Sequence, residues 1–188
     1  YIVKKGDFDM YTVRFQLELS GSEKRFLSKS FFYANQMHNQ LVRYATNRLN
    51  ALFHDKEYVD ARKAYGEAEF SKKKGSELSA SEKKKKKELS NIMCIKQKEY
   101  NLTKISLCKF VSKEQKKYKN YINSHQAQAE AEAVYKGVEK VLFEDGRHLH
   151  YRRYNSFDCI KQKCAATGVR LLRWDTICFM KHYYKVRV

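Results

Sequence analysis

The spacing of apolar positions changes twice along the chain. Residues 13–19 alternate apolar and polar side chains, which predicts a strand, and residues 20–22 (Ser-Gly-Ser) then have the composition of a turn. From 28 to 54 the apolar residues recur at steps of three and four, which predicts one long helix with a single apolar stripe. From Arg147 onward the period of two returns. The predicted order is therefore strand, helices, strands.

The middle of the chain predicts further helices. A short one is expected at about 56–70. The lysine-rich stretch after it, 71–87, reads as a flexible tip because blocks of like charge repel one another and resist packing. Helical spacing resumes near the end of this stretch, and Thr103 is a good N-cap for the helix that follows. Asn123, with Gln126 three residues later, has the pattern of a capping box at the start of the last helix.

The last helix carries a seam of small apolar residues. Small side chains allow another helix to approach closely, and Gly146 suits the end of the helix. The seam consists of Ala127, Ala131, Val134, Val138 and Val141.

Three strands are expected toward the end of the chain, at 147–154, 169–174 and 177–188. The simplest packing returns them to the opening strand. The predicted fold class is therefore α+β, a β-barrel or sheet that is split by an inserted helical bundle. The expected parts are 1–22 and 147–188 for the β structure and 23–146 for the helices.

The charge balance points to a polyanionic partner. The 188 residues include 39 Lys and Arg against 21 Asp and Glu, a formal charge of +18 that is costly in a compact protein unless a partner neutralises it. The 14 Tyr and 11 Phe are interleaved with these cations, which suits single-stranded RNA or a duplex that contains RNA. No apolar run is long enough to predict a membrane span. The odd cysteine count, five, favours free thiols in a reducing compartment.

Two helices carry polar rows. On the long helix, polar residues recur along one face, at Asn35, Asn39, Arg43, Asn47 and Asn50. Because Asn is a poor helix former, this row costs stability, and it fits either a solvated face or a row that touches a sugar–phosphate backbone. The helix after Thr103 presents four cations on its outer side, a ladder suited to phosphates. These cations are Lys109, Lys113, Lys116 and Lys117.

We find no catalytic centre and predict no metal site. Cys159 and Cys164 are spaced as a zinc pair, but no second pair follows. A metal-dependent nuclease acting alone would have to use Asp7, Asp9 and the pair His148 and His150, and for this hypothesis we expect no cleavage. Arginines beside the two histidines disfavour a cation there and favour phosphate.

Four stretches of sequence resemble the TnpB family of transposon-encoded RNA-guided DNA nucleases, which are related to compact type V CRISPR effectors. The stretches are residues 34–45 (ANQMHNQLVRYA) with 48–50 (RLN), residues 123–128 (NSHQAQ), residues 138–143 (VEKVLF) and residues 150–155 (HYRRYN). In that family a wedge β-barrel is split by a helical recognition domain, which is the order of elements expected here. The family's RuvC-like nuclease, with its catalytic acids and Mg²⁺, lies downstream of the barrel. It is expected to be absent from this chain, and none of its catalytic residues can be carried over.

The resemblance implies two sets of binding residues. Those expected to face the RNA–DNA heteroduplex or flanking DNA are Arg43, Asn47, Asn50, Lys109, Lys113, Lys116, Ser124, His125 and Gln128. Those expected to face guide RNA are Arg14, Arg147, His150, Arg152, Arg153, Arg170 and Arg173. In such proteins the protein reads duplex shape while base pairing supplies the sequence.

The expected partners are therefore guide RNA and target DNA, with no membrane and no cofactor in this chain. The expected location is a prokaryotic cytoplasm, at the nucleoid when DNA is bound. Both a monomer and a homodimer remain open. The alternative function is a general RNA-binding or ribosome-associated protein that uses no guide.

Overall fold

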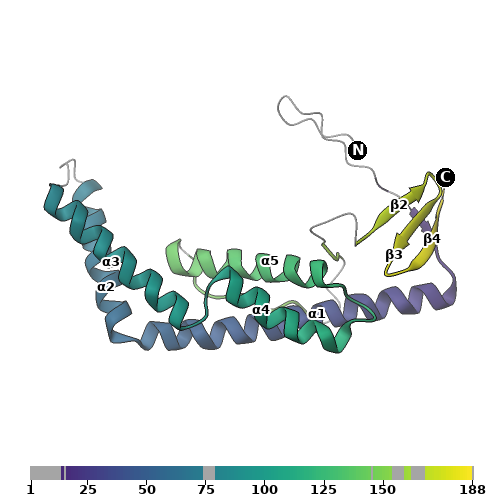
Figure 1. The fold of residues 1–188 in the computed structure, drawn as a ribbon, viewed down its shortest axis with the longest axis horizontal. Helices are drawn as coiled ribbons and strands as arrows, with labels where there is room; N and C mark the ends of the chain where they lie inside the picture. Colours follow the sequence, from purple (N-terminus) through teal and green to yellow (C-terminus); the bar gives the residue numbers. More distant parts are fainter. Residues whose placement is uncertain are drawn as a thin grey trace, which may run out of the picture.

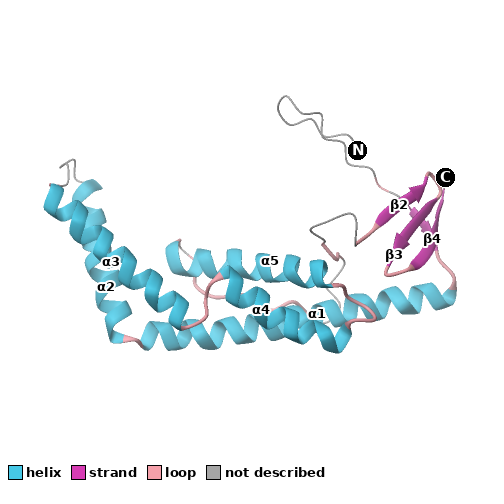
Figure 2. Ribbon diagram, in the orientation of Figure 1, coloured by secondary structure: helices cyan, strands magenta, loops and turns pink. Residues whose placement is uncertain are grey.

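A computed structural model of the chain describes residues 14, 16–73, 79–144, 146–153, 159–161 and 168–187, and only the backbone of 69–73. The helices are α1 (Gly21–His54), α2 (Lys56–Lys73), α3 (Ala80–Glu99), α4 (Lys104–Gln115), a 3-10 turn η1 (Lys116–Tyr118) and α5 (Ser124–Phe143). The strands are β1 (Gln16–Glu18), β2 (Arg170–Arg173), β3 (Thr176–Phe179) and β4 (His182–Arg187). The strands gather at one end of α1, and α2 and α3 form a hairpin at its other end (Figures 1 and 2). The α+β class is confirmed.

The long helix α1 begins at Gly21, seven residues before the predicted start. Ser20 caps it, since its Oγ accepts from the backbone N–H of Glu23 and the Glu23 carboxylate accepts from the Ser20 N–H at 2.7 Å. The prediction of a turn at 20–22 was therefore wrong, because these residues open a capping box. At 1.5 Å per residue, the 34-residue helix is about 51 Å long.

The lysine-rich stretch is helical in its described part. The backbone of 71–73 continues α2, and the five lysines 83–87 lie inside α3, which Ser79 and Glu82 open with a second capping box. The helices therefore extend into the predicted tip at 71–73 and 80–87, whereas 74–78 lie outside the described part, and the flexibility of 71–87 stays a prediction. Lysine is a good helix former, and consecutive positions on a helix point in different directions, so the like charges spread out.

The core lies where α1, α4 and α5 pack together. The predicted seam of α5 is buried, with Ala127, Ala131 and Val138 fully inaccessible, as are Leu41 of α1 and Leu107 of α4. The caps at Thr103 and Asn123 are formed as predicted. These three helices make the platform on which the candidate interface is built.

The segment 146–153 forms no regular secondary structure and pairs with no strand. It lies along α1, where the side chains of Asn35 and Asn39 donate to the backbone carbonyls of Arg153 and Arg152 at 3.0 and 2.9 Å. Asn39 Oδ1 also accepts from the Arg152 N–H. The predicted strand at 147–154 was therefore wrong over 147–153, because helix side chains supply the hydrogen bonds that a neighbouring strand would supply. Tyr154 lies outside the described residues.

The sheet has the antiparallel order β1-β4-β3-β2. The last strand pairs with the first, with Leu17 opposite Val186, so the predicted return of the late strands to the opening one is confirmed. The single strand predicted at 177–188 is instead two strands, which turn at Met180 and Lys181 with φ angles of 51° and 65°. Among the described residues this is an open sheet, and a closed barrel remains a prediction.

The sheet packs against the first turns of α1. The Phe26 ring lies 4.0 Å from the His182 ring and 6.5 Å from the Phe179 ring, measured between centroids. It also lies 5.4 Å from Tyr121, which precedes α5. One face of the sheet is thus covered by α1, and the opposite, outward face carries the exposed Tyr183 next to the buried Cys178.

Candidate nucleic-acid interface

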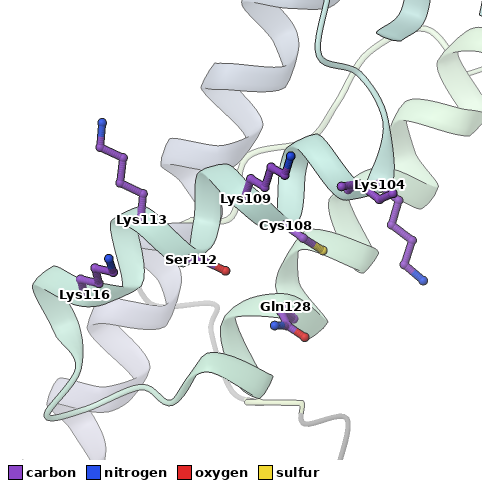
Figure 3. A pocket seen from close by; sticks show the side chains of 8 residues that line it. Lys104, Cys108, Lys109, Ser112, Lys113, Lys116 and Gln128 are labelled. Atoms are coloured by element: carbon purple, nitrogen blue, oxygen red, sulfur yellow. The ribbon is translucent and has the colours of Figure 1, made fainter.

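A groove runs along α4 on the side that faces α5. It encloses about 540 Å³. Figure 3 draws the residues that line it and labels seven of them, of which six belong to α4 or η1 and one, Gln128, belongs to α5. The complete lining is Lys104, Ile105, Cys108, Lys109, Ser112, Lys113, Lys116 and Gln128. Four of the predicted heteroduplex residues therefore share this groove.

Three of the groove lysines carry charge that no described acid neutralises. Lys109, Lys113 and Lys116 are exposed, and no described carboxylate lies within 4.0 Å of their amines. Two neighbouring lysines do form ion pairs. Lys104 Nζ lies 2.6 Å from the Glu132 carboxylate, which raises the pKa of Lys104, and Lys117 Nζ lies 2.6 Å from the Glu114 carboxylate. The predicted fourth cation of the ladder, Lys117, is thus already paired within the chain.

The spacing of the three lysines suits a sugar–phosphate backbone. Steps of four and three residues keep them on one helix face, about 6 and 4.5 Å apart along the axis. We call Lys109, Lys113 and Lys116 the α4 lysine row. Gln128 and Ser112 lie beside the row and offer hydrogen-bond donors and acceptors that charge alone would not provide.

The remaining heteroduplex candidates lie outside this groove. Ser124 and His125 begin α5, whose first turn contains no acid. Arg43, Asn47 and Asn50 are exposed on α1. The polar row of α1 is therefore divided, because Asn35 and Asn39 hold the 146–153 segment and only its later members face solvent.

The predicted guide-RNA residues fall into separate regions. Arg147 and His150 line a hollow of about 440 Å³ at the end of α5, together with Lys140 and His148. Arg170 and Arg173 are exposed on β2, and Arg14 is exposed before β1. Arg153 is exposed beside α1. The structure does not bring this set onto one surface.

Arg152 is directed into the protein. Its Nη1 lies 2.9 Å from Oε2 of Glu130, and Nδ1 of His38 lies 3.0 Å from the same oxygen. Glu130 is 3% exposed, so its charge is compensated within the chain. Sequence reasoning missed this cluster, although a glutamate within the alanine and valine seam of α5 was a visible signal.

No group of three or more His, Cys, Asp or Glu residues that could hold a metal ion occurs among the described residues. The rings of His148 and His150 lie 4.5 Å apart. Asp7, Asp9 and Cys164, considered above as ligands, lie outside the described part. Within that part, no helix is both long and apolar enough for a membrane span.

Comparison of the chain with protein-family models, with curated proteins and with solved structures finds no match.

Proposed function

We propose that this chain binds nucleic acid through the α4 lysine row, and that its partner is a duplex containing RNA. The observation that carries the proposal is the row itself, three exposed cations along α4 and the start of η1 with no described carboxylate within 4.0 Å of their amines, beside Ser112 and Gln128. Such a row attracts phosphates whatever the base sequence, because the interaction is between charges.

The proposed partner in full is a guide RNA and its heteroduplex with target DNA. Support comes from the sequence resemblance and from the order of elements, since the helices are inserted between β1 and the strands that join it in one sheet. In this proposal the row and Gln128 hold the heteroduplex backbone, while Arg170 and Arg173 on β2 hold folded guide RNA. Base pairing then supplies the sequence specificity.

Two measurements test this function. The first sequences the RNA that copurifies with the chain, for which we expect one dominant structured species with a defined guide segment. Heterogeneous RNA would support the general RNA-binding function instead. The second is a competition titration with a heteroduplex of about 20 base pairs, the matching DNA duplex and heparin. We expect the heteroduplex to compete best. Equal displacement by all three would contradict the proposal.

A further inference from the structure

The outward face of the sheet is defined by the strand register. Arg170 on β2 lies opposite Cys178 on β3, which lies opposite Tyr183 on β4. In a second row, Arg173 lies opposite Thr176, which lies opposite Lys185. On the other face Ile177, Tyr184 and Val186 are buried, whereas Leu171 on the edge strand β2 is 53% exposed. Cys178 is buried too, although it lies between Arg170 and Tyr183, so the face of Arg170 and Tyr183 is open on β2 and β4 but not at Cys178 of β3. We call the face that carries Arg170, Arg173, Tyr183, Lys185 and Arg187 the open face.

Tyr183 is the aromatic centre of the open face. Its side chain is 63% exposed although it lies on an inner strand, between β1 and β3. The adjacent Tyr184 is 1% exposed and fills the core, so Tyr183 is not needed there. An exposed ring in the middle of a sheet is the geometry on which proteins stack unpaired bases.

Cations lie on the same face of the sheet as the Tyr183 ring. Arg170, Arg173, Lys185 and Arg187 are all exposed, and Glu18 is the acid that the register places opposite Lys185. No described carboxylate lies within 4.0 Å of the four cationic groups. The face therefore combines an aromatic ring with a net positive field.

A hollow of about 490 Å³ lies at one end of the open face. Arg170 and Lys181 line it from the sheet, and Lys119, Asn120 and Asn123 line it from the connection before α5. Three cations and the Asn120 amide are suited to a phosphate group, whereas Asn123 caps α5. Arg170 belongs both to the hollow and to the row that contains Tyr183. It lies two strands from Tyr183, about 9.6 Å away at a strand spacing of about 4.8 Å, which leaves room for a base on the ring and a neighbouring phosphate in the hollow.

Within the proposed function, which assigns Arg170 and Arg173 to guide RNA, we infer that the open face binds an unpaired, single-stranded segment of nucleic acid. Tyr183 stacks on an unpaired base, and cations of the same face hold the phosphates. A base inside a duplex is already stacked on both sides and cannot lie flat on the ring. The open face therefore selects single strands, whereas the α4 lysine row contacts duplex backbone. The two surfaces share no residue and can be tested separately.

The test uses the whole 188-residue chain and a single-stranded RNA of about 10 nucleotides, a length in the usual range for such surfaces. The RNA carries one 2-aminopurine, whose fluorescence falls when an aromatic ring stacks on it. We expect quenching on binding. Tyr183→Leu should abolish the quenching and weaken affinity about 10-fold. Tyr183→Phe, which keeps the ring, should stay within about two-fold of the wild type.

Tyr151→Leu is the matched control, since Tyr151 is 55% exposed in the segment along α1, away from the sheet. This variant should bind as the wild type does. Thermal unfolding of both Leu variants should be unchanged because neither ring is buried. Absence of quenching in the wild type, or equal affinity of Tyr183→Leu, would overturn the inference. Because duplex binding is measured on the other surface, this result would leave the α4 proposal standing.

Discussion

Asn39 of α1 forms two hydrogen bonds with the backbone of Arg152. Its Nδ2 donates to the carbonyl oxygen at 2.9 Å, and its Oδ1 accepts from the N–H at 2.9 Å. A primary amide presents a donor and an acceptor side by side, as a peptide group on a neighbouring strand does. One helix side chain thus hydrogen-bonds to the backbone of the segment 146–153, at a residue 113 positions away in sequence.

Asn39→Ala should destabilise the protein by about 2 kcal/mol, because both backbone groups of Arg152 lose a partner in a half-buried place. Asn47→Ala is the matched control on the same helix, where the side chain is exposed, and should change stability by less than about 0.5 kcal/mol. Urea unfolding measures both. Equal effects would show that the amide pairing contributes nothing.

Glu130 links α5, its own helix, to two other parts of the fold, since it lies beside His38 of α1 and Arg152 of the segment 146–153. Glu130→Ala removes the shared partner of two groups and should cost about 3 kcal/mol of unfolding free energy. Glu132→Ala, two residues along α5, removes the acid that pairs with Lys104, a half-exposed lysine, and should cost less than Glu130→Ala. A Glu130 variant as stable as the Glu132 variant would contradict the role of the cluster.

Gly146 and Gly66 should respond in opposite ways to replacement by alanine. A Cβ at Gly146 would lie 2.8 Å from the carbonyl carbon of Lys140, which is backbone and cannot rotate away, so Gly146→Ala should destabilise by about 1 to 3 kcal/mol. A Cβ at Gly66, inside α2, meets nothing within 4 Å, so Gly66→Ala should stabilise by about 0.5 to 1 kcal/mol. Thermal melts of the two variants should shift in opposite directions, and shifts of the same sign would refute this assignment.

Asp55 links the α1–α2 junction to the end of α3. The backbone N–H of Tyr58 donates to its carboxylate, Tyr100 donates its hydroxyl, and Lys96 lies 3.2 Å away. The Tyr58 hydrogen bond, more than the others, lowers the Asp55 pKa below its usual 3.8. The carboxylate therefore stabilises the fold above that value, and the contribution is lost as pH falls through the lower folded-state pKa.

The stability difference between wild type and Asp55→Asn should shrink as pH falls from about 6 to about 2. A constant difference across this range would contradict the linkage.

Local periodicity predicted the helices well because each one buries a stripe that its own spacing defines. The caps at Thr103 and Asn123 and the α4 lysine row could also be predicted, because each depends on residues that are close together in the sequence. The capping box at Ser20 was equally local, but it was taken for a turn. Local patterns therefore contained enough information for these elements, provided that caps were distinguished from turns.

The remaining errors came from long-range partners and unusual turns. The period of two at 147–153 predicted a strand, but it could not show that Asn39, far away in sequence, would supply the hydrogen bonds to Arg152 instead. The β3–β4 turn uses Met180 and Lys181 with positive φ, without the Asn or Gly that marks such turns, so two strands read as one. The inward direction of Arg152 depends on Glu130, which only the packed helices bring close.

The most direct test of the central claim is the salt dependence of heteroduplex binding. Each lysine that contacts a phosphate contributes about one unit to the slope of log K against log salt concentration. The variant Lys109→Gln/Lys113→Gln/Lys116→Gln should reduce the magnitude of the slope by about three units. The variant Lys83→Gln/Lys84→Gln/Lys85→Gln removes the same charge from the exposed start of α3 and should leave the slope unchanged. Equal slopes for the two variants would mean that net charge, and not the α4 lysine row, determines binding.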